Sequence, residues 1–341
     1  RRGKPELHVN VPAPNQKAAD GLSYQQDARG QGGYSFTYTD HNGEPNHYLI
    51  PEQGRSGFKR ADFENLQILG QGESGQVFLA IHRPTQRQFA VKEISITATE
   101  TRHQMCKELQ ALHECGRTDH IVNLIDFFAE EGRVYLVLEY MDWGSIDRLL
   151  KILKDNGSRM EEPVLSVIMG CVLHALNFLH GTHKLIHRDL KPGNVVLNKQ
   201  GVAKLTDLGV SRVLNMEGKG ITFVGTAAYM SPERLEGRHY TSKADIWSVG
   251  VIAVECALGK HPYLTGQESS FFDLMQRVVV DPPAVPDGSG LSEELVSFIR
   301  CCLMKDEQSR SSAHDLLQHP FILRYSHLGF EPLRQCLSGL P

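Results

Sequence analysis

The chain has 341 residues, 40% hydrophobic and 22% charged, with a formal net charge of −4. This composition is typical of a globular protein with one large or two modest domains, and it gives no basic stripe of the kind that nucleic acid or anionic lipid would need. The seven cysteines include no Cys-x-x-Cys pair, so neither a disulfide framework nor a zinc site is expected. A reducing compartment, the cytosol or the nucleus, is the expected location.

Residues 1–58 are predicted to be an N-terminal extension. They are poor in aliphatic runs and rich in Gly, Gln, Asn and Asp, and no apolar signal segment follows Arg1. Within the extension, residues 34–50 alternate weakly between apolar and polar on both sides of an Asn42-Gly43 turn. This pattern predicts a β-hairpin.

From Phe63 the chain becomes rich in strand segments separated by Gly and Pro-Thr turn signals. Long helix-like segments at 163–180, 243–258 and 291–304 follow Trp143. The first of them is apolar enough to raise the question of a membrane span, but its polar residues recur on one helix face, which favours a core helix and no membrane span. The chain therefore reads as α+β, with a β-rich lobe before a helical lobe.

Three glycines, Gly70, Gly72 and Gly75, form a Gly-x-Gly-x-x-Gly pattern. Dinucleotide-binding folds share this pattern, but there the third glycine opens a helix. Here the strand-like residues 76–79 follow, which predicts a glycine-rich hairpin instead. Glycines in such a hairpin let the backbone approach phosphate oxygens and donate N–H groups to them.

Lys92 lies inside the apolar strand segment "FAVKEI". A solvated lysine on an edge strand is the ordinary interpretation of an isolated residue of this kind. A buried lysine, however, needs a partner, and Glu108 on the following predicted helix can supply the counter-charge. As a pair, the two residues suit an ammonium group directed at phosphate.

The segment "LIHRDLKPGNVVL" displays polar residues on a loop between apolar flanks. Asp189 can accept a hydroxyl proton, Lys191 can neutralise a transferring phosphoryl group, and Asn194 can offer a carbonyl oxygen to a metal. Asp207 in "LTDLGV" adds a second hard oxygen ligand suited to Mg²⁺. This set indicates phosphoryl transfer.

In their order and spacing, these motifs resemble the eukaryotic protein kinase signature over residues 63–321. The resemblance implies the bilobal kinase fold, with an N-lobe at 59–138, a hinge at 139–142, a C-lobe at 143–325 and a C-terminal tail at 326–341. It also implies ATP and Mg²⁺ as cofactors.

The kinase resemblance also implies a role for each matching residue. Lys92, paired with Glu108, would bind the α- and β-phosphates, Asp189 would be the catalytic base, and Lys191 and Thr226 would lie beside it. Asn194 and Asp207 would hold Mg²⁺, and Leu138 would guard the back pocket. The implied ATP contacts are Leu69, Gly70, Gln71, Gly72, Gly75, Val77, Ala90, Lys92, Leu138, Glu139, Met141 and Asn194. Structural roles are implied for Asp245 and for Glu233, expected to be buried and paired with Arg310.

One departure is Asp207-Leu208-Gly209, where kinases usually have Asp-Phe-Gly. The metal ligand is intact and Leu208 is still an apolar plug. We therefore expect an altered stiffness of this switch and retained catalysis.

Finer segments, among them "LEYMDWGSID" and "ITFVGTAAYMSPERLEG", resemble the MAP kinase kinases, and Lys191 is typical of kinases that phosphorylate Ser or Thr. This implies a dual-specificity kinase with a downstream MAP kinase as substrate and an upstream activating kinase. Two alternatives stay open: a Ste20-like or MAP kinase kinase kinase-like Ser/Thr kinase, and a pseudokinase scaffold.

Regulation is implied by Arg188, which in resembling kinases binds a phosphate on the activation loop. The second activating site of MAP kinase kinases falls on Thr222, whereas the first falls on Gly218, which has no hydroxyl. We therefore predict activation by phosphorylation of Thr222 alone.

The first eleven residues resemble a MAP kinase docking motif, with basic residues before alternating apolar ones. The residues concerned are Arg1, Arg2, Lys4, Leu7, Val9 and Val11.

Overall fold

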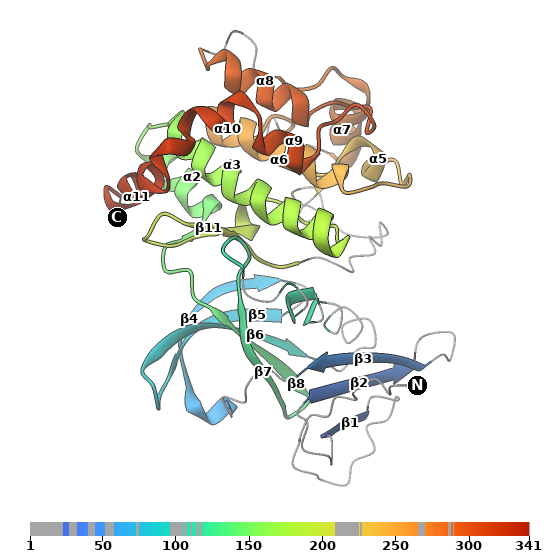
Figure 1. Cartoon of the computed structure of the whole chain (residues 1–341), viewed down its shortest axis with the longest axis vertical. Helices are drawn as coiled ribbons and strands as arrows, with labels where there is room; N and C mark the ends of the chain where they lie inside the picture. The colour runs from blue at the N-terminus through green and yellow to red at the C-terminus, as the bar shows by residue number, and fades with distance from the viewer. Residues whose placement is uncertain are drawn as a thin grey trace. The chain divides into compact units, whose positions relative to one another are not determined.

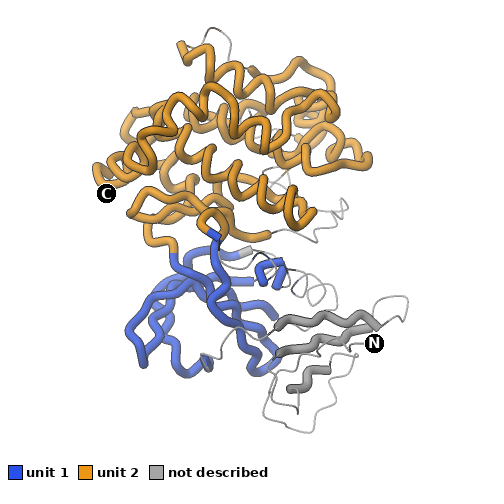
Figure 2. Tube along the Cα trace, viewed as in Figure 1, with its two compact units in different colours: residues 1–118, 122–140 blue, residues 119–121, 141–341 orange. Residues whose placement is uncertain are grey.

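The computed structural model describes residues 58–72, 75–95, 118–208, 227–264, 270–285 and 290–340. It also describes Met105, 108–109, 111–113, Cys115, Gly225 and Gly288, and the backbone of 23–26, 33–39 and 45–51. The chain divides into two compact units (Figure 2). Unit 1 comprises residues 1–118 and 122–140, and unit 2 comprises residues 119–121 and 141–341. The boundary at 140/141 falls inside the segment predicted as a hinge.

A small antiparallel sheet forms within the predicted N-terminal extension. Its strands are β1 (Ser23–Gln26), β2 (Gly33–Thr39) and β3 (Pro45–Pro51), in the order β1-β2-β3. Strands β2 and β3 are the two arms of the segment predicted as a hairpin, whereas β1 was not predicted.

The main sheet of unit 1 is antiparallel with the order β4-β5-β6-β8-β7. The strands are β4 (Phe63–Gly72), β5 (Gly75–His82), β6 (Arg87–Ser95), β7 (Leu124–Glu130) and β8 (Arg133–Glu139). One face carries a cluster of buried side chains, in which Phe128 stacks on Phe63 and on Tyr135. Ala80 of β5 and Phe89 of β6 belong to the same cluster, so this packing holds together the strands that carry Lys92 and the glycine-rich hairpin.

The structure requires glycine at position 75 for a reason that the sequence pattern did not reveal. Its φ is +131°, and a Cβ there would come within 2.0 Å of the Glu93 carbonyl oxygen on β6. Only glycine fits this close approach. The third glycine of the pattern is therefore required by the packing of β5 against β6, in addition to the approach to phosphate that the sequence predicts.

Unit 2 is mostly helical (Figure 1). Its helices are α2 (Ile146–Asp155), α3 (Glu162–Asn177), α5 (Pro232–Leu235), α6 (Lys243–Leu258), α7 (Phe271–Met275), α8 (Glu293–Cys302), α9 (Ala313–Leu317), α10 (Pro320–Tyr325) and α11 (Glu331–Ser338). Short π-helical segments η2 (Phe178–His183) and η4 (Gln276–Val280) follow directly on α3 and α7. A small sheet of order β11-β10-β9 joins β9 (Gly144–Ser145), β10 (Val195–Leu197) and β11 (Ala203–Leu205).

Helix α3 is the centre of unit 2 and packs on β11, α6, α9, α10 and α11 (Figure 1). Residues 162–183 form a helix that, by length and composition, could cross a membrane, but 61% of its apolar window is buried inside the structure. The core helix of a globular protein passes the same test. The Ser166 hydroxyl donates to the Phe321 carbonyl at 3.2 Å, a contact of a core helix with its neighbour.

The segment predicted as a tail is part of this packing. Leu333 of α11 is fully buried, and the Trp143 indole N–H donates to the Leu337 carbonyl at 3.3 Å. The last residues therefore help to close the core of unit 2.

Candidate active site

In unit 1, β6 places Lys92 in the interior, where it pairs with Glu108. The Lys92 Nζ donates to Glu108 Oε1 at 2.6 Å, and the two residues are only 3% and 6% exposed. Such a buried pair is stable only when both charges are present, so the ammonium is held in one position. The pairing inferred from the sequence is therefore present in the structure.

The other residues of unit 1 implied as ATP contacts lie on β4, β5, β6 and the end of β8. Leu138 is buried next to Glu139, whose N–H donates to the Asn123 carbonyl at 3.0 Å. The Glu139 carboxylate in turn accepts the Asn123 N–H at 3.0 Å. These two bonds fix the end of β8, where the predicted hinge begins.

In unit 2, three of the predicted catalytic residues form one cluster. The Asp189 carboxylate accepts hydrogen bonds from Lys191 Nζ at 3.1 Å and from Asn194 Nδ2 at 3.0 Å. Asn194 Nδ2 also donates to the Asp189 carbonyl at 2.7 Å. Because the amide nitrogen makes both bonds, the amide oxygen of Asn194 is the group that can act as a metal ligand.

Two residues of this region have a backbone that non-glycine residues rarely adopt. Arg188 has φ +68° and Asp207 has φ +55°. Strained conformations of this kind occur at functional sites where surrounding bonds compensate the cost. For Arg188 these bonds come from Asp245, whose carboxylate accepts the N–H groups of His187 at 2.8 Å and Arg188 at 2.9 Å.

Asp245 is itself fully buried in α6. Burial alone would raise its pKa, but the hydrogen bond from His180 Nε2, 2.8 Å long, the electrostatic effect of His180 and His187, and the backbone N–H of Arg188 bring the pKa below its usual value. Asp245 is therefore ionised, and its charge holds the catalytic loop in place. The sequence reasoning did not single out His180.

Leu208, which replaces phenylalanine in the Asp-x-Gly motif, is 2% exposed. The side chain is thus buried as an apolar plug would be.

Behind the predicted substrate segment, Arg310 forms a bidentate pair with Glu233, with bonds of 2.8 and 3.0 Å. Both residues are 1% exposed. The structure thus brings together the pair inferred from the sequence.

The sequence did not reveal a second buried pair in the predicted substrate segment, between Tyr229 and Glu255. The Tyr229 hydroxyl donates to Glu255 at 2.6 Å, and burial raises the pKa of both groups. The signal that could have revealed it is Glu255 itself, an acid in the otherwise apolar run of α6.

Several predicted residues lie outside the described part of the chain. These are Thr222, Thr226 and the docking residues Arg1, Arg2, Lys4, Leu7, Val9 and Val11.

A comparison with family models adds to this geometry. Residues 63–322 match the family model described as "Protein kinase domain". The chain belongs to the protein kinase family. The kinase thus has the fold that the sequence predicted, a five-stranded antiparallel sheet followed by a mostly helical region, and ATP is its phosphoryl donor.

The kinase is also similar to curated MAP kinase kinases. It is 42% identical over 276 residues to Mitogen-activated protein kinase kinase 2 of Arabidopsis thaliana, covering 79% of this chain and 74% of the relative. It is 41% identical over 275 residues to Mitogen-activated protein kinase kinase 1c of Physcomitrium patens, covering 78% of each. This similarity agrees with the resemblance of the finer sequence segments to MAP kinase kinases.

Two residues of unit 2 carry oxygen donors of the kind that Mg²⁺ prefers. Asn194 offers an amide oxygen and Asp207 a carboxylate, and Mg²⁺ prefers such hard oxygen ligands. Mg²⁺ commonly takes one or two protein ligands and completes its shell with water and phosphate oxygens. The donor set therefore fits this ion.

Proposed function

We propose that this kinase is a MAP kinase kinase that transfers the γ-phosphoryl group of ATP to Thr or Ser and to Tyr hydroxyls of a downstream MAP kinase. The observation that carries the transfer step is the cluster of Asp189, Lys191 and Asn194. The similarity to curated MAP kinase kinases supports the substrate class.

In this proposal each unit has its own task. Lys92, held by Glu108, binds the α- and β-phosphates. Asp189 orients the substrate hydroxyl and accepts its proton, while Lys191 neutralises charge on the transferring group. Asn194 and Asp207 hold Mg²⁺, which when bound neutralises the charge of the phosphate oxygens.

Phosphorylation of Thr222 by an upstream kinase would activate the enzyme, with Arg188 binding the phosphate. Residues 1–11 would dock the cognate MAP kinase. Deletion of residues 1–11 should weaken MAP kinase binding and leave ATP affinity unchanged.

The test is a kinase assay against a panel of catalytically inactive MAP kinases, with the phosphorylated residues mapped by mass spectrometry. We expect phosphate on a Thr and a Tyr of one MAP kinase, and none with the Asp189→Asn variant. Transfer only to generic peptides would instead indicate a Ste20-like or MAP kinase kinase kinase-like enzyme. Absence of any Mg-ATP turnover after treatment with an upstream kinase that phosphorylates Thr222 would indicate a pseudokinase.

A further inference from the structure

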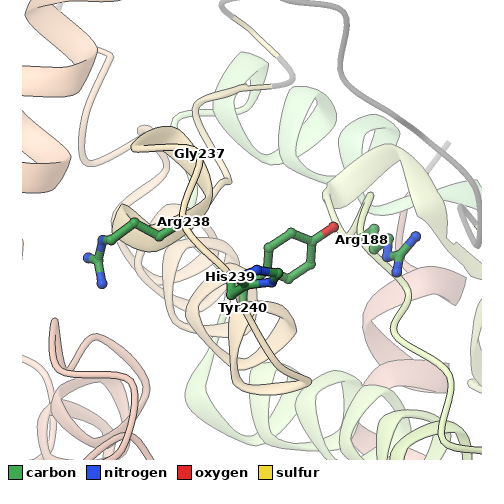
Figure 3. Close-up of a pocket in the computed structure, with 5 residues that line it drawn as sticks. All are labelled: Arg188, Gly237, Arg238, His239 and Tyr240. Carbon is green, nitrogen blue, oxygen red and sulfur yellow. The ribbon is translucent and has the colours of Figure 1, made fainter.

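Several aromatic rings of unit 2 have an arginine over them. One is Tyr240, which lies beside Arg188 at the pocket shown in Figure 3. Another is Trp143, directly after the predicted hinge, with the Arg148 guanidinium 5.0 Å from its ring centre. Tyr240 lies next to the catalytic loop, whereas neither the catalytic motifs nor the implied ATP contacts include Trp143. Trp143 is nevertheless only 4% exposed, and its contacts give it a role.

The main chain of Trp143 belongs to a turn that is anchored to the rest of unit 2. Its N–H donates to the Leu197 carbonyl of β10 at 3.1 Å, and its carbonyl accepts a hydrogen bond from Arg148 Nη1 at 2.9 Å. Within the turn, the Gly144 N–H donates to the Met141 carbonyl at 3.3 Å. The position of Met141, an implied ATP contact, therefore depends on how firmly this turn is held.

The indole ring of Trp143 adds an anchor from helix α11. Its N–H donates at 3.3 Å to the carbonyl of Leu337, in the last turn of the helix, where carbonyls lack the usual donors four residues further on. The helix is itself fixed, because Leu333 and Leu337 are buried. At its other end the Phe330 carbonyl oxygen lies 2.6 Å from the position that a Cβ at Gly201 would take, in the turn between β10 and β11. Helix α11 thus contacts both the turn after the hinge and the hairpin that anchors it.

We propose that Trp143 is a positioning residue for ATP, through which helix α11 acts on the affinity for the nucleotide. Trp143 holds the turn that contains Met141, and a ligand contact that is displaced by about 1 Å binds more weakly. The coupling is reciprocal: if the bond to α11 favours ATP binding, ATP binding favours that bond by the same free energy. The inference rests on the nucleotide-binding part of the proposed function and not on the substrate class.

The first experiment measures the affinity of the whole chain for AMP-PNP, a non-hydrolysable ATP analogue, by calorimetry in the presence of Mg²⁺. Trp143→Phe keeps an aromatic ring beside Arg148 and removes the N–H that binds Leu337. The Kd should rise roughly three- to tenfold, since at most the free energy of one hydrogen bond is transferred to binding.

The matched control is Trp247→Phe, the same change at the other tryptophan of the chain. The Trp247 ring also has an arginine over it, Arg310 at 5.3 Å, but its Nε1 has no hydrogen-bond partner among the residues that the structure describes. Both variants should lower the melting temperature, because both change a buried ring. Only Trp143→Phe should change the Kd, which distinguishes positioning from a merely structural role.

The second experiment tests the reciprocal effect and keeps Trp143. In Trp247→Phe the emission of Trp143 is observed alone, and AMP-PNP should change it. In the wild type, AMP-PNP should slow amide hydrogen exchange in α11 more than in α9, a short helix of the same unit for which no coupling is proposed. A helix that only closes the core would show neither effect.

The proposal is overturned if Trp143→Phe and Trp247→Phe bind AMP-PNP equally tightly. It is also overturned if the analogue changes neither the emission of Trp143 nor the exchange of α11 relative to α9. A wild type that binds no nucleotide would instead contradict the proposed function, and this inference with it. No MAP kinase is present in either experiment, so the proposed substrate class succeeds or fails separately.

Discussion

Arg310 and Glu233, 77 residues apart in the sequence, form a buried bidentate ion pair. Arg310 also donates to the carbonyls of Met304 and Lys243, each at 2.8 Å. The guanidinium therefore joins α5 to the start of α6 and to the segment after α8. Burial would raise the pKa of Glu233, but Arg310 brings it below the usual value, so the carboxylate is ionised.

Arg310→Met should destabilise the protein strongly, because it leaves the Glu233 carboxylate buried without its partner. We expect a loss of about 3–5 kcal/mol in the free energy of unfolding, measured by urea denaturation. The control is Arg324→Met, which breaks an exposed pair with Glu294 and should cost well under about 1 kcal/mol. Equal losses for the two variants would contradict this account.

The catalytic cluster predicts separate effects on chemistry and on stability. Asp189→Asn should lower the turnover of Mg-ATP by roughly 10²- to 10⁴-fold, because the amide cannot accept the hydroxyl proton. Lys191→Met should also lower turnover, since it removes the cation 3.1 Å from Asp189. Steady-state kinetics with a MAP kinase substrate measure both effects.

For these two variants the melting temperature distinguishes lost chemistry from lost folding. Lys191 is partly exposed, so its replacement should change the melting temperature little. Full activity of Asp189→Asn in a correctly folded protein would exclude Asp189 as the base.

The pair of Lys92 and Glu108 allows a double-mutant test. Lys92→Met alone leaves a buried carboxylate and should cost about 3–5 kcal/mol of stability, together with most of the ATP affinity. Lys92→Met combined with Glu108→Leu replaces the charged pair by apolar side chains and should recover much of the stability, but none of the ATP affinity.

Urea unfolding and ATP titration of the two single variants and the double variant complete the cycle. Glu108→Leu alone leaves the ammonium buried and should be about as unstable as Lys92→Met. A double variant as unstable as the sum of the two single variants would show that the pair is not coupled in the folded protein.

Two pairs that the sequence predicted, Lys92 with Glu108 and Glu233 with Arg310, are in contact in the structure. The partners of Lys92 and Glu233 are 16 and 77 positions away. The first was inferred from the need of a buried lysine for a counter-charge, and the second was implied by the kinase resemblance. The sequence did not reveal the Tyr229–Glu255 pair or the Arg188, Arg234 and Tyr240 contacts, because these depend on how α5 and α6 pack, which local patterns do not encode.

The fold, like the site, could be predicted from the sequence only in part. The strand segments after Phe63 and helix α6 follow from residue periodicity, and α6 has the predicted bounds, 243–258. Periodicity does not predict the strand order β4-β5-β6-β8-β7 or the burial of α11. Both result from contacts between residues that are distant in the chain. Gly250 illustrates the reason: a Cβ there would come within 2.7 Å of Cys302 on α8, so glycine is required by a neighbour 52 positions away.

The pH dependence of stability should depend in part on His261. Burial lowers the pKa of His261 to about 4. Its Nδ1 accepts the N–H groups of Tyr263 at 3.1 Å and Leu264 at 3.2 Å, which requires the neutral ring. In the unfolded chain the pKa is about 6.5, so between pH 6.5 and 4 the unfolded chain binds more protons than the folded one.

The contribution of His261 to stability is therefore fully present above pH 6.5 and is lost as the pH falls toward 4. The loss should reach about 3 kcal/mol at pH 4, since each unit of pKa difference corresponds to about 1.4 kcal/mol. Urea unfolding at pH 7.5, 6, 5 and 4 measures it, and His261→Asn should reduce the loss of stability between pH 7.5 and 4. His314→Asn, a change at an exposed histidine, is the control and should keep the wild-type pH dependence. If His261→Asn follows the same pH profile as this control, the acid sensitivity of the fold has its origin in other groups.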